Sequence, residues 1–188
     1  MEKVVLFTRQ HENALRILEE TGVFRMKPEW IQKKYGSISD YYMKVYDWLV
    51  MESARRVPRP PGVSYPVWCS VDEGYMLREV QGEVVFKLQI DADKIIYFDS
   101  PKWDMILNHM YLPKDDEDEQ KFLKELTSRG ITNQFTLFDH SQGRFYPDLQ
   151  RRITESWHRV FQIKDWNMFT VQANIWEFCP ADILEIRK

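Results

Sequence analysis

Cysteine and histidine are scarce in this chain, whose 188 residues include only 2 Cys and 4 His. Cys69 and Cys179 have neither a CxxC partner nor the Cys/His spacing of zinc ligands, so we expect them to be free thiols. The histidines are scattered along the sequence and form no ligand motif. These absences exclude the usual zinc modules and predict a protein that holds no metal.

Long apolar runs and a secretory leader are also missing. No apolar run approaches the roughly 18 residues that a membrane-spanning helix requires. The N-terminal run Met1–Phe7 is followed too soon by Arg9 and Gln10 to be a signal peptide. We therefore expect a cytoplasmic protein with no membrane partner.

Glycine is sparse as well, with 7 residues, and the glycine-rich nucleotide motifs are absent. The sequence contains no GxGxxG, no GxxxxGK[ST] and no GxSxG. A Rossmann or P-loop mechanism is therefore excluded, and nothing local predicts a Ser or Cys nucleophile with an oriented histidine.

An excess of positive charge is missing too, since the formal net charge is −3. This argues against a protein that binds duplex nucleic acid over a broad basic surface, because such binding needs many phosphate contacts. A local basic groove stays open, formed by Arg55, Arg56 and Arg59 or by Arg151 and Arg152. The same arginines fit ordinary solvated faces equally well.

What the sequence does have is a globular composition, 44% apolar and 14% aromatic, with clear periodicity. Two-residue alternation and apolar runs predict strands at Val4–Thr8, Tyr65–Val71, Val84–Ile90, Ile95–Phe98, Thr170–Phe178 and Ile183–Ile186. Helical spacing predicts helices at His11–Glu20, Ile38–Val57, Trp103–Met110, Asp115–Leu126 and from Asp148 onward, with a loop over Ile131–Tyr146. This order favours an α+β domain with a mainly antiparallel sheet.

Two polar features interrupt the predicted strands. The turn Thr8-Arg9-Gln10 lies where the first strand leaves the sheet, a common position for ligand-binding groups. Thr8 and Gln10 are equally able to satisfy backbone groups there while Arg9 points to water. Glu177 ends the apolar face of the late strand, so its carboxylate either reaches solvent or lines a cleft, because burying it unpaired is costly.

Aromatic and polar landmarks recur along nearly the whole chain: Leu6-Phe7-Thr8 with Gln10, Tyr46-Asp47-Trp48, Tyr65-Pro66-Val67-Trp68, Trp103 with Leu107-Asn108, Tyr111-Leu112-Pro113, Ser156-Trp157 with Arg159, and Gln172-Ala173 with Trp176-Glu177. This series resembles an uncharacterised bacterial family catalogued as a domain of unknown function. The resemblance carries no established activity.

A second resemblance implies an activity. The first strand followed by Asn13–Gly22, the pair Phe86–Ile90 and Ile95–Asp99, and a late strand with Glu177 are similar to the ADP-ribosyltransferase fold. That resemblance implies one domain over 1–188, with two small antiparallel sheets forming an NAD-binding cleft and a helical insertion near 101–165. It also implies a transferase that modifies a macromolecule (RNA, DNA or protein), as a toxin or phage-defence effector, with a neutralising antitoxin as a further partner.

The same resemblance assigns roles to individual residues. Arg9 would hold the dinucleotide, Ser70 would support the site, and Glu177 would act in catalysis. Gln172 would position the acceptor, and Asn174 stands two residues later, where the family usually carries its glutamate.

Further NAD contacts follow from residue chemistry. Tyr46 or Trp68 suits stacking on a planar ring, and Thr8 and Gln10 lie beside Arg9. A rival hypothesis is a non-catalytic module whose aromatic and Arg-lined groove binds a nucleotide, single-stranded nucleic acid or a protein.

Overall fold

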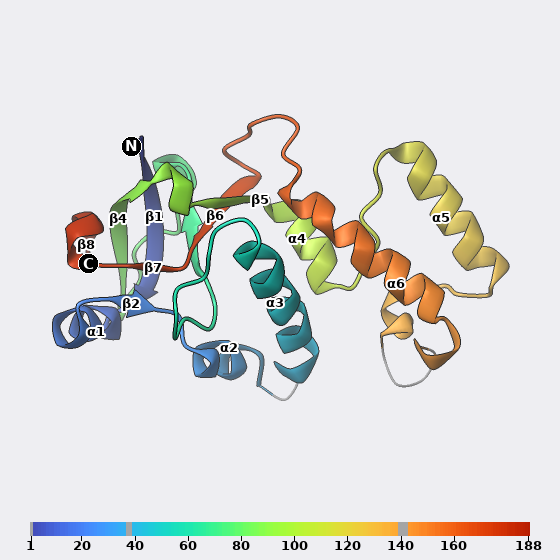
Figure 1. Ribbon diagram of the computed structural model, residues 1–188, viewed down its shortest axis with the longest axis horizontal. Helices are drawn as coiled ribbons and strands as arrows, with labels where there is room; N and C mark the ends of the chain where they lie inside the picture. Colours follow the sequence, from blue (N-terminus) through green and yellow to red (C-terminus); the bar gives the residue numbers. More distant parts are fainter. Residues whose placement is uncertain (1, 37–38, 139–142) are drawn as a thin grey trace. The chain divides into compact units, whose positions relative to one another are not determined.

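The chain divides into two compact units in the computed structural model, which describes residues 2–36, 39–138 and 143–188 (Figure 1). Unit 1 comprises Met1–Phe98 and Asp165–Lys188, and unit 2 comprises Asp99–Lys164. Unit 1 holds the β-sheets, whereas unit 2 is helical.

A six-stranded sheet organises unit 1, with strand order β5-β6-β3-β1-β4-β8. The strands are β1 (Lys3–His11), β3 (Val67–Ser70), β4 (Glu83–Asp91), β5 (Ile96–Asp99), β6 (Val171–Ile175) and β8 (Ile183–Arg187). The pairs of β1 with β3 and β4, of β3 with β6, and of β4 with β8 are antiparallel. This confirms the predicted α+β class and antiparallel pairing.

One side of this sheet, here called the core face, carries the apolar alternation of the strands. Its buried residues include Leu6, Val67, Cys69, Phe86, Leu88, Ala173 and Ile175. Thr8 shares this face because it lies two residues after Leu6. Arg9 therefore projects to the other side, here called the outer face.

A second sheet of two short strands, β2 (Phe24–Arg25) and β7 (Glu177–Phe178), packs on the core face. Phe178 contacts Phe24 and Phe86, with ring centroids 5.0 and 5.2 Å apart. The expectation of two small sheets forming a cleft is corrected here, because one sheet is large and phenyl rings fill the space between the sheets.

The predicted late strand Thr170–Phe178 is two strands rather than one. The chain bends at Trp176, whose indole Nε1 donates to the carbonyl of Val57 at 2.9 Å. β6 ends before this bend and β7 begins after it. Glu177 consequently belongs to the small sheet, a consequence of a long-range contact that strand periodicity does not reveal.

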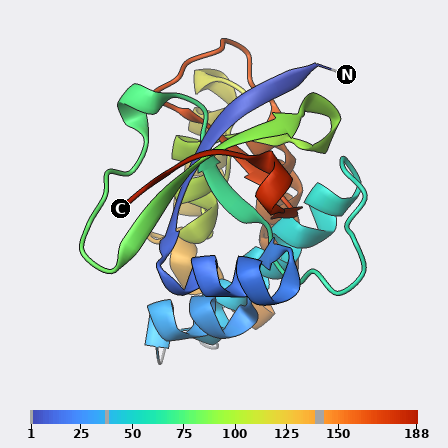
Figure 2. The same ribbon diagram turned by 90° about the vertical axis from the view of Figure 1, so that its left-hand side faces the viewer.

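The helices of unit 1 are α1 (Asn13–Thr21), α2 (Pro28–Tyr35) and α3 (Ser39–Ala54). Gly22 ends α1 as predicted, with φ of 72° and its N–H bonded to Leu18 O. Figure 2 shows α1 beside the C-terminal end of β1. α2 was not predicted, and the predicted start of the next helix, Ile38, lies outside the described residues.

Unit 2 contains α4 (Ser100–Leu107), α5 (Asp116–Ser128) and α6 (Pro147–Ser156). Asp99 and Asp115 cap α4 and α5 through their side chains, and carboxylates fill the first turn of α5. The predicted loop Ile131–Tyr146 contains short 3₁₀ turns, and its residues 139–142 lie outside the described ones. Short 3₁₀ segments among the described residues include Glu73–Tyr75, Ala92–Lys94, Gln134–Leu137, Gly143–Phe145, Trp157–Phe161 and Pro180–Asp182.

Among the described residues, no helix combines the length and the apolar character that crossing a bilayer requires.

Candidate functional site

The turn predicted at Thr8-Arg9-Gln10 is instead strand, because β1 continues to His11 and pairs these three residues with β4. Thr8 is 2% exposed and its hydroxyl donates to Trp68 O at 2.7 Å. Gln10 Nε2 donates to Thr8 Oγ1 at 2.8 Å. Thr8 therefore does satisfy a backbone group, and it fixes the amide of Gln10 at the edge of the core face.

A hollow of about 280 Å³ opens next to Gln10. We call it the β1-end hollow, and its lining residues are Gln10, His11, Asn13, Ala14, Phe24, Trp30 and Lys33. The rings of Phe24 and Trp30 stack with centroids 5.7 Å apart. His11 Nδ1 accepts from the backbone N–H of Asn13 at 3.1 Å. An aromatic wall thus stands beside amide, imidazole and ammonium groups.

Sequence reasoning identified only Gln10 among these residues. His11 and Asn13 continue the polar sequence of Thr8-Arg9-Gln10 into α1, and this continuity was a usable signal. Trp30 and Lys33 belong to α2, and they reach the hollow through tertiary packing that no local pattern indicates.

Arg9 points away from this hollow. Its Nε lies 2.5 Å from Glu83 Oε2, and its NH1 donates to Arg78 O at 3.0 Å. Glu83 balances the charge of the guanidinium, and the two partners together fix it on the outer face.

Glu177 lines a different hollow of about 400 Å³, here called the Glu177 hollow. Arg25 Nε donates to Glu177 Oε2 at 2.7 Å, and the Glu177 side chain is 31% exposed. Lys94 and Asp182 lie among the other lining residues. Glu177 therefore combines partial exposure with a position at a concave surface.

The structure does not bring Arg9 and Glu177 into one hollow. Arg9 pairs with Val85 on β4, whereas Ile90, five residues further along β4, lines the Glu177 hollow. Five strand residues span roughly 17 Å. Because Arg9 also projects from the outer face, the two groups lie on opposite sides of the large sheet.

Four other predicted residues, Tyr46, Trp68, Ser70 and Gln172, come together on the outer face. Tyr46 and Trp68 have ring centroids 5.8 Å apart. Ser70 is paired in register with Gln172 on one side and with Phe7 on the other. Tyr46 is only 7% exposed, so its ring packs within the protein.

Asn174 lies next to this group, in register with Trp68. Its side chain is buried, and neither amide atom has a hydrogen-bond partner within the described residues. Leaving a buried polar group unsatisfied costs about 1–3 kcal/mol. Asn174 is therefore a buried polar residue that costs stability unless something further satisfies its amide.

A family model described as Domain of unknown function (DUF3841) matches residues 5–183. The chain belongs to the DUF3841 family. The match spans most of unit 1 and all of unit 2 and confirms the first resemblance. No curated protein and no solved structure matches the chain.

Neither cysteine of this DUF3841 chain is in a disulfide, as predicted. Burial raises the pKa of the Cys69 thiol to about 12, although a hydrogen bond with Thr8 acts in the opposite direction. The thiol is therefore protonated at neutral pH and is a poor nucleophile. In the described ranges no cluster of three or more His, Cys, Asp or Glu side chains suits a metal ion.

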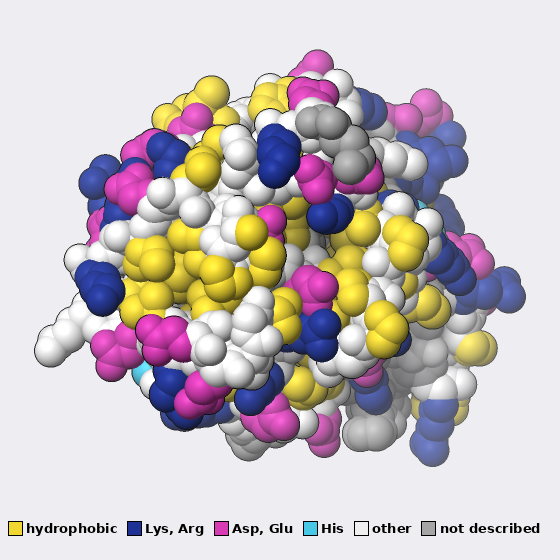
Figure 3. Space-filling model, turned by 60° about the vertical axis from the view of Figure 1, so that its left-hand side comes forward, with side chains coloured by type: hydrophobic (Ala, Val, Ile, Leu, Met, Phe, Trp, Pro, Cys, Tyr) yellow, Lys and Arg dark blue, Asp and Glu magenta, His cyan; other side chains and the backbone are white. Residues whose placement is uncertain are grey.

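Most of the arginines proposed for a basic groove in this DUF3841 chain bind its own acceptors. Arg55 and Arg56 both contact Glu52, which is 2% exposed. Arg152 pairs with Glu125 and lies over the ring of Phe122. On the face drawn in Figure 3, acidic and basic side chains lie next to one another. This pairing fits a solvated, charge-balanced surface.

Proposed function

We propose that this DUF3841 protein binds NAD, with one heterocycle of the dinucleotide in the β1-end hollow. The stacked pair of Phe24 and Trp30, flanked by the polar end of β1, carries the proposal. Ligand pockets combine such an apolar wall with a few placed polar groups. A hollow of about 280 Å³ suits one ring and part of its ribose, so the rest of the dinucleotide would lie outside it.

Each group of the hollow has a suitable role toward NAD. The indole of Trp30 offers a stacking surface for nicotinamide or adenine. The amides of Gln10 and Asn13 suit hydrogen bonds to a carboxamide or to ribose hydroxyls. Lys33, which is exposed, supplies a cation for the pyrophosphate.

The reaction proposed is ADP-ribosyl transfer, the activity that the second resemblance implies. The bond between the nicotinamide nitrogen and ribose C1′ breaks, and its electron pair leaves with nicotinamide. A nucleophile on the macromolecular acceptor then bonds to C1′ and loses its proton. Because positive charge develops on the sugar, a fixed carboxylate lowers the barrier.

Glu177 is the carboxylate proposed for this step. In its favour, Phe24 of the β1-end hollow and Arg25, the partner of Glu177, are consecutive residues of β2. β2 thus lines the β1-end hollow through Phe24 and pairs with β7, whose Glu177 lines the other hollow. The bond from Arg25 Nε to Glu177 Oε2 orients the carboxylate, as electrostatic stabilisation of the sugar requires.

Isothermal titration calorimetry with NAD tests the binding. Trp30→Ala should weaken NAD binding about tenfold or more, since base stacking contributes roughly 1–3 kcal/mol. Lys33→Ala should weaken it less, and Lys44→Ala, an exposed lysine on α3, should leave it unchanged. Unaltered affinity in Trp30→Ala would exclude the β1-end hollow as the NAD site.

Nicotinamide release tests the reaction separately. Purified protein given NAD together with RNA, DNA or lysate protein should release nicotinamide, and Glu177→Gln should abolish release while NAD still binds. Expression of the wild type should slow bacterial growth, and Glu177→Ala should relieve it. Saturable NAD binding without any release would instead support the non-catalytic binding module.

A further inference from the structure

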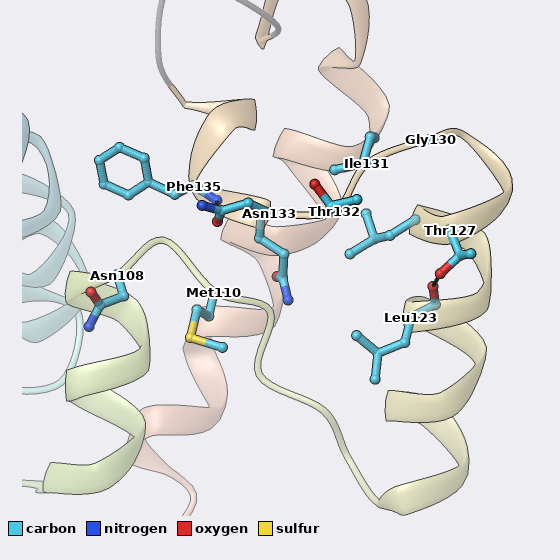
Figure 4. A pocket seen from close by; sticks show the side chains of 11 residues that line it. Asn108, Met110, Leu123, Thr127, Gly130, Ile131, Thr132, Asn133 and Phe135 are labelled. Carbon is cyan, nitrogen blue, oxygen red and sulfur yellow. Dashed lines mark hydrogen bonds between the residues drawn. The ribbon is translucent and has the colours of Figure 1, made fainter.

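Unit 2 has a hollow without charged lining residues, and none of its residues belongs to the site proposed for NAD. It is a hollow of about 700 Å³ between the C-terminal half of α5 and the segments on either side of it (Figure 4). Its lining residues are Asn108, Met110, Leu123, Leu126, Thr127, Gly130, Ile131, Thr132, Asn133, Gln134 and Phe135. None of these side chains is charged, although α5 begins with a run of carboxylates. We call it the amide hollow.

Apolar side chains form two of its walls. Leu123 is 44% exposed and Met110 is 37% exposed, and Figure 4 shows them on opposite sides of the hollow. Leu123, Leu126 and Thr127 share one face of α5 by helical spacing. Phe135, 42% exposed, lies at the edge. Large apolar side chains that stay in water around a concave surface are typical of a binding site.

The Met110 wall is held in place by an uncommon backbone conformation. His109 has φ of 52°, which residues other than glycine rarely adopt. The centroid of its buried ring lies 4.6 Å from the ring centroid of Phe138 and 5.7 Å from that of Trp157. Trp157 Nε1 donates to Met110 O at 2.9 Å. Such over-determined backbone outliers cluster at functional sites.

Three carboxamides in the lining are fixed by bonds to the backbone. Asn108 Nδ2 donates to Asp104 O at 2.8 Å, so its oxygen remains available. Asn133 Oδ1 accepts from Phe135 N at 3.0 Å, and Gln134 Oε1 accepts from Tyr111 N at 2.8 Å. Their nitrogens, Asn133 Nδ2 and Gln134 Nε2, remain as donors.

We propose that the amide hollow binds an uncharged nucleobase or nucleoside. A planar base fits between apolar walls such as those of Met110 and Leu123. Two oriented amide donors and one acceptor match base edges that offer two acceptors and one donor, as uracil does, and Asn and Gln are common readers of base edges. Because no Lys or Arg lines the hollow, a phosphate adds nothing to binding. This site is independent of the NAD site proposed for unit 1.

Uridine and adenosine, titrated into the full chain and followed by NMR chemical shifts, test the proposal. Saturable shifts should appear at Met110 and at the residues of the amide hollow, with uridine monophosphate binding no more tightly than uridine. Asn133→Asp keeps the oxygen that accepts from Phe135 N but removes the donor nitrogen, so folding is retained. It should weaken binding roughly three- to tenfold.

Leu123→Ala should weaken binding by a similar factor, and Leu184→Ala is its matched control, because Leu184 of unit 1 is 52% exposed. Absence of saturable shifts with both nucleosides would overturn the proposal. Equal affinity in wild type, Asn133→Asp and Leu123→Ala would overturn it too, as would a monophosphate that binds far more tightly than its nucleoside.

Discussion

The β1-end hollow of unit 1 and the amide hollow of unit 2 are built in opposite ways. The first takes its residues from β1, α1, β2 and α2 and mixes charged with aromatic groups. The second takes all of its residues from one stretch of the chain, 108–135, and has no charged group. Tertiary packing of strands and helices assembles the first hollow, whereas a helix and the segments flanking it assemble the second.

This difference makes unit 1 the part in which function depends most on long-range packing. Phe24 belongs both to the core of unit 1 and to the β1-end hollow. A substitution that disturbs the packing of the small sheet is therefore expected to alter the proposed NAD site directly. The amide hollow depends instead on bonds within unit 2, from Phe135 N to Asn133 and from Tyr111 N to Gln134.

The largest expected effect comes from Phe178→Ala. Phe178 is 1% exposed and contacts both Phe24 and Phe86. Its removal leaves a cavity between the two sheets and should lower the free energy of unfolding by about 3–5 kcal/mol. Urea unfolding followed by circular dichroism measures this. Phe169→Ala, at a position 66% exposed, should cost less than about 0.5 kcal/mol; similar losses in both variants would contradict the packing described here.

A smaller effect is expected in unit 2 from Asp118→Asn. The Asp118 carboxylate accepts from Tyr111 OH at 2.8 Å and from Lys114 N at 2.9 Å. Replacing the charged acceptor should cost roughly 1–2 kcal/mol, since bonds to charged groups contribute more than neutral ones.

The same carboxylate makes the stability of unit 2 depend on pH, and the sign of this dependence follows from the pKa shift of Asp118. Partial burial alone raises the pKa of Asp118, but the bonds from Lys114 N–H and Tyr111 and the charge of Arg159 lower it below its usual 3.8. Stability from Asp118 is therefore present above about pH 3.8 and is lost as the pH falls through the lower folded-state pKa. The melting temperature of the wild type should fall more steeply on acidification than that of Asp118→Asn. Parallel curves of melting temperature against pH would exclude this contribution.

Periodicity predicted most strands and helices correctly because it reports which side of an element is buried. It could not predict α2 or β2, whose short segments lack a strong repeat, nor the bend at Trp176, which depends on Val57 far away in the chain. For the candidate site, the sequence singled out Thr8 and Gln10, but it predicted a turn where β1 in fact continues to His11. It did not reveal that Arg9 and Glu177 lie on opposite sides of the large sheet, because the bend at Trp176 moves Glu177 into the small sheet.

Asn174→Leu is expected to have a small stabilising effect on unit 1. The two amide atoms of Asn174 are buried without partners within the described part of the chain, and leucine is similar in volume. Removing the unsatisfied groups should raise the free energy of unfolding by about 1 kcal/mol. Urea unfolding decides this, with Asn174→Asp as the opposite control, because a buried carboxylate should destabilise the protein. A clear loss of stability in Asn174→Leu would show that the amide is satisfied in solution.

The smallest effect is expected where the proposed chemistry lies, at the pair of Arg25 and Glu177. Both side chains are about one-third exposed, at 38% and 31%. Pairs this open to water contribute only about 0.2–1 kcal/mol, so Glu177→Gln and Arg25→Ala should each unfold close to the wild type. Nicotinamide release should nonetheless fall in both variants, because the carboxylate or its orienting cation is lost. A large loss of stability in Glu177→Gln would instead show that Glu177 has a structural role in the small sheet. The proposed transferase would then lack a catalytic carboxylate.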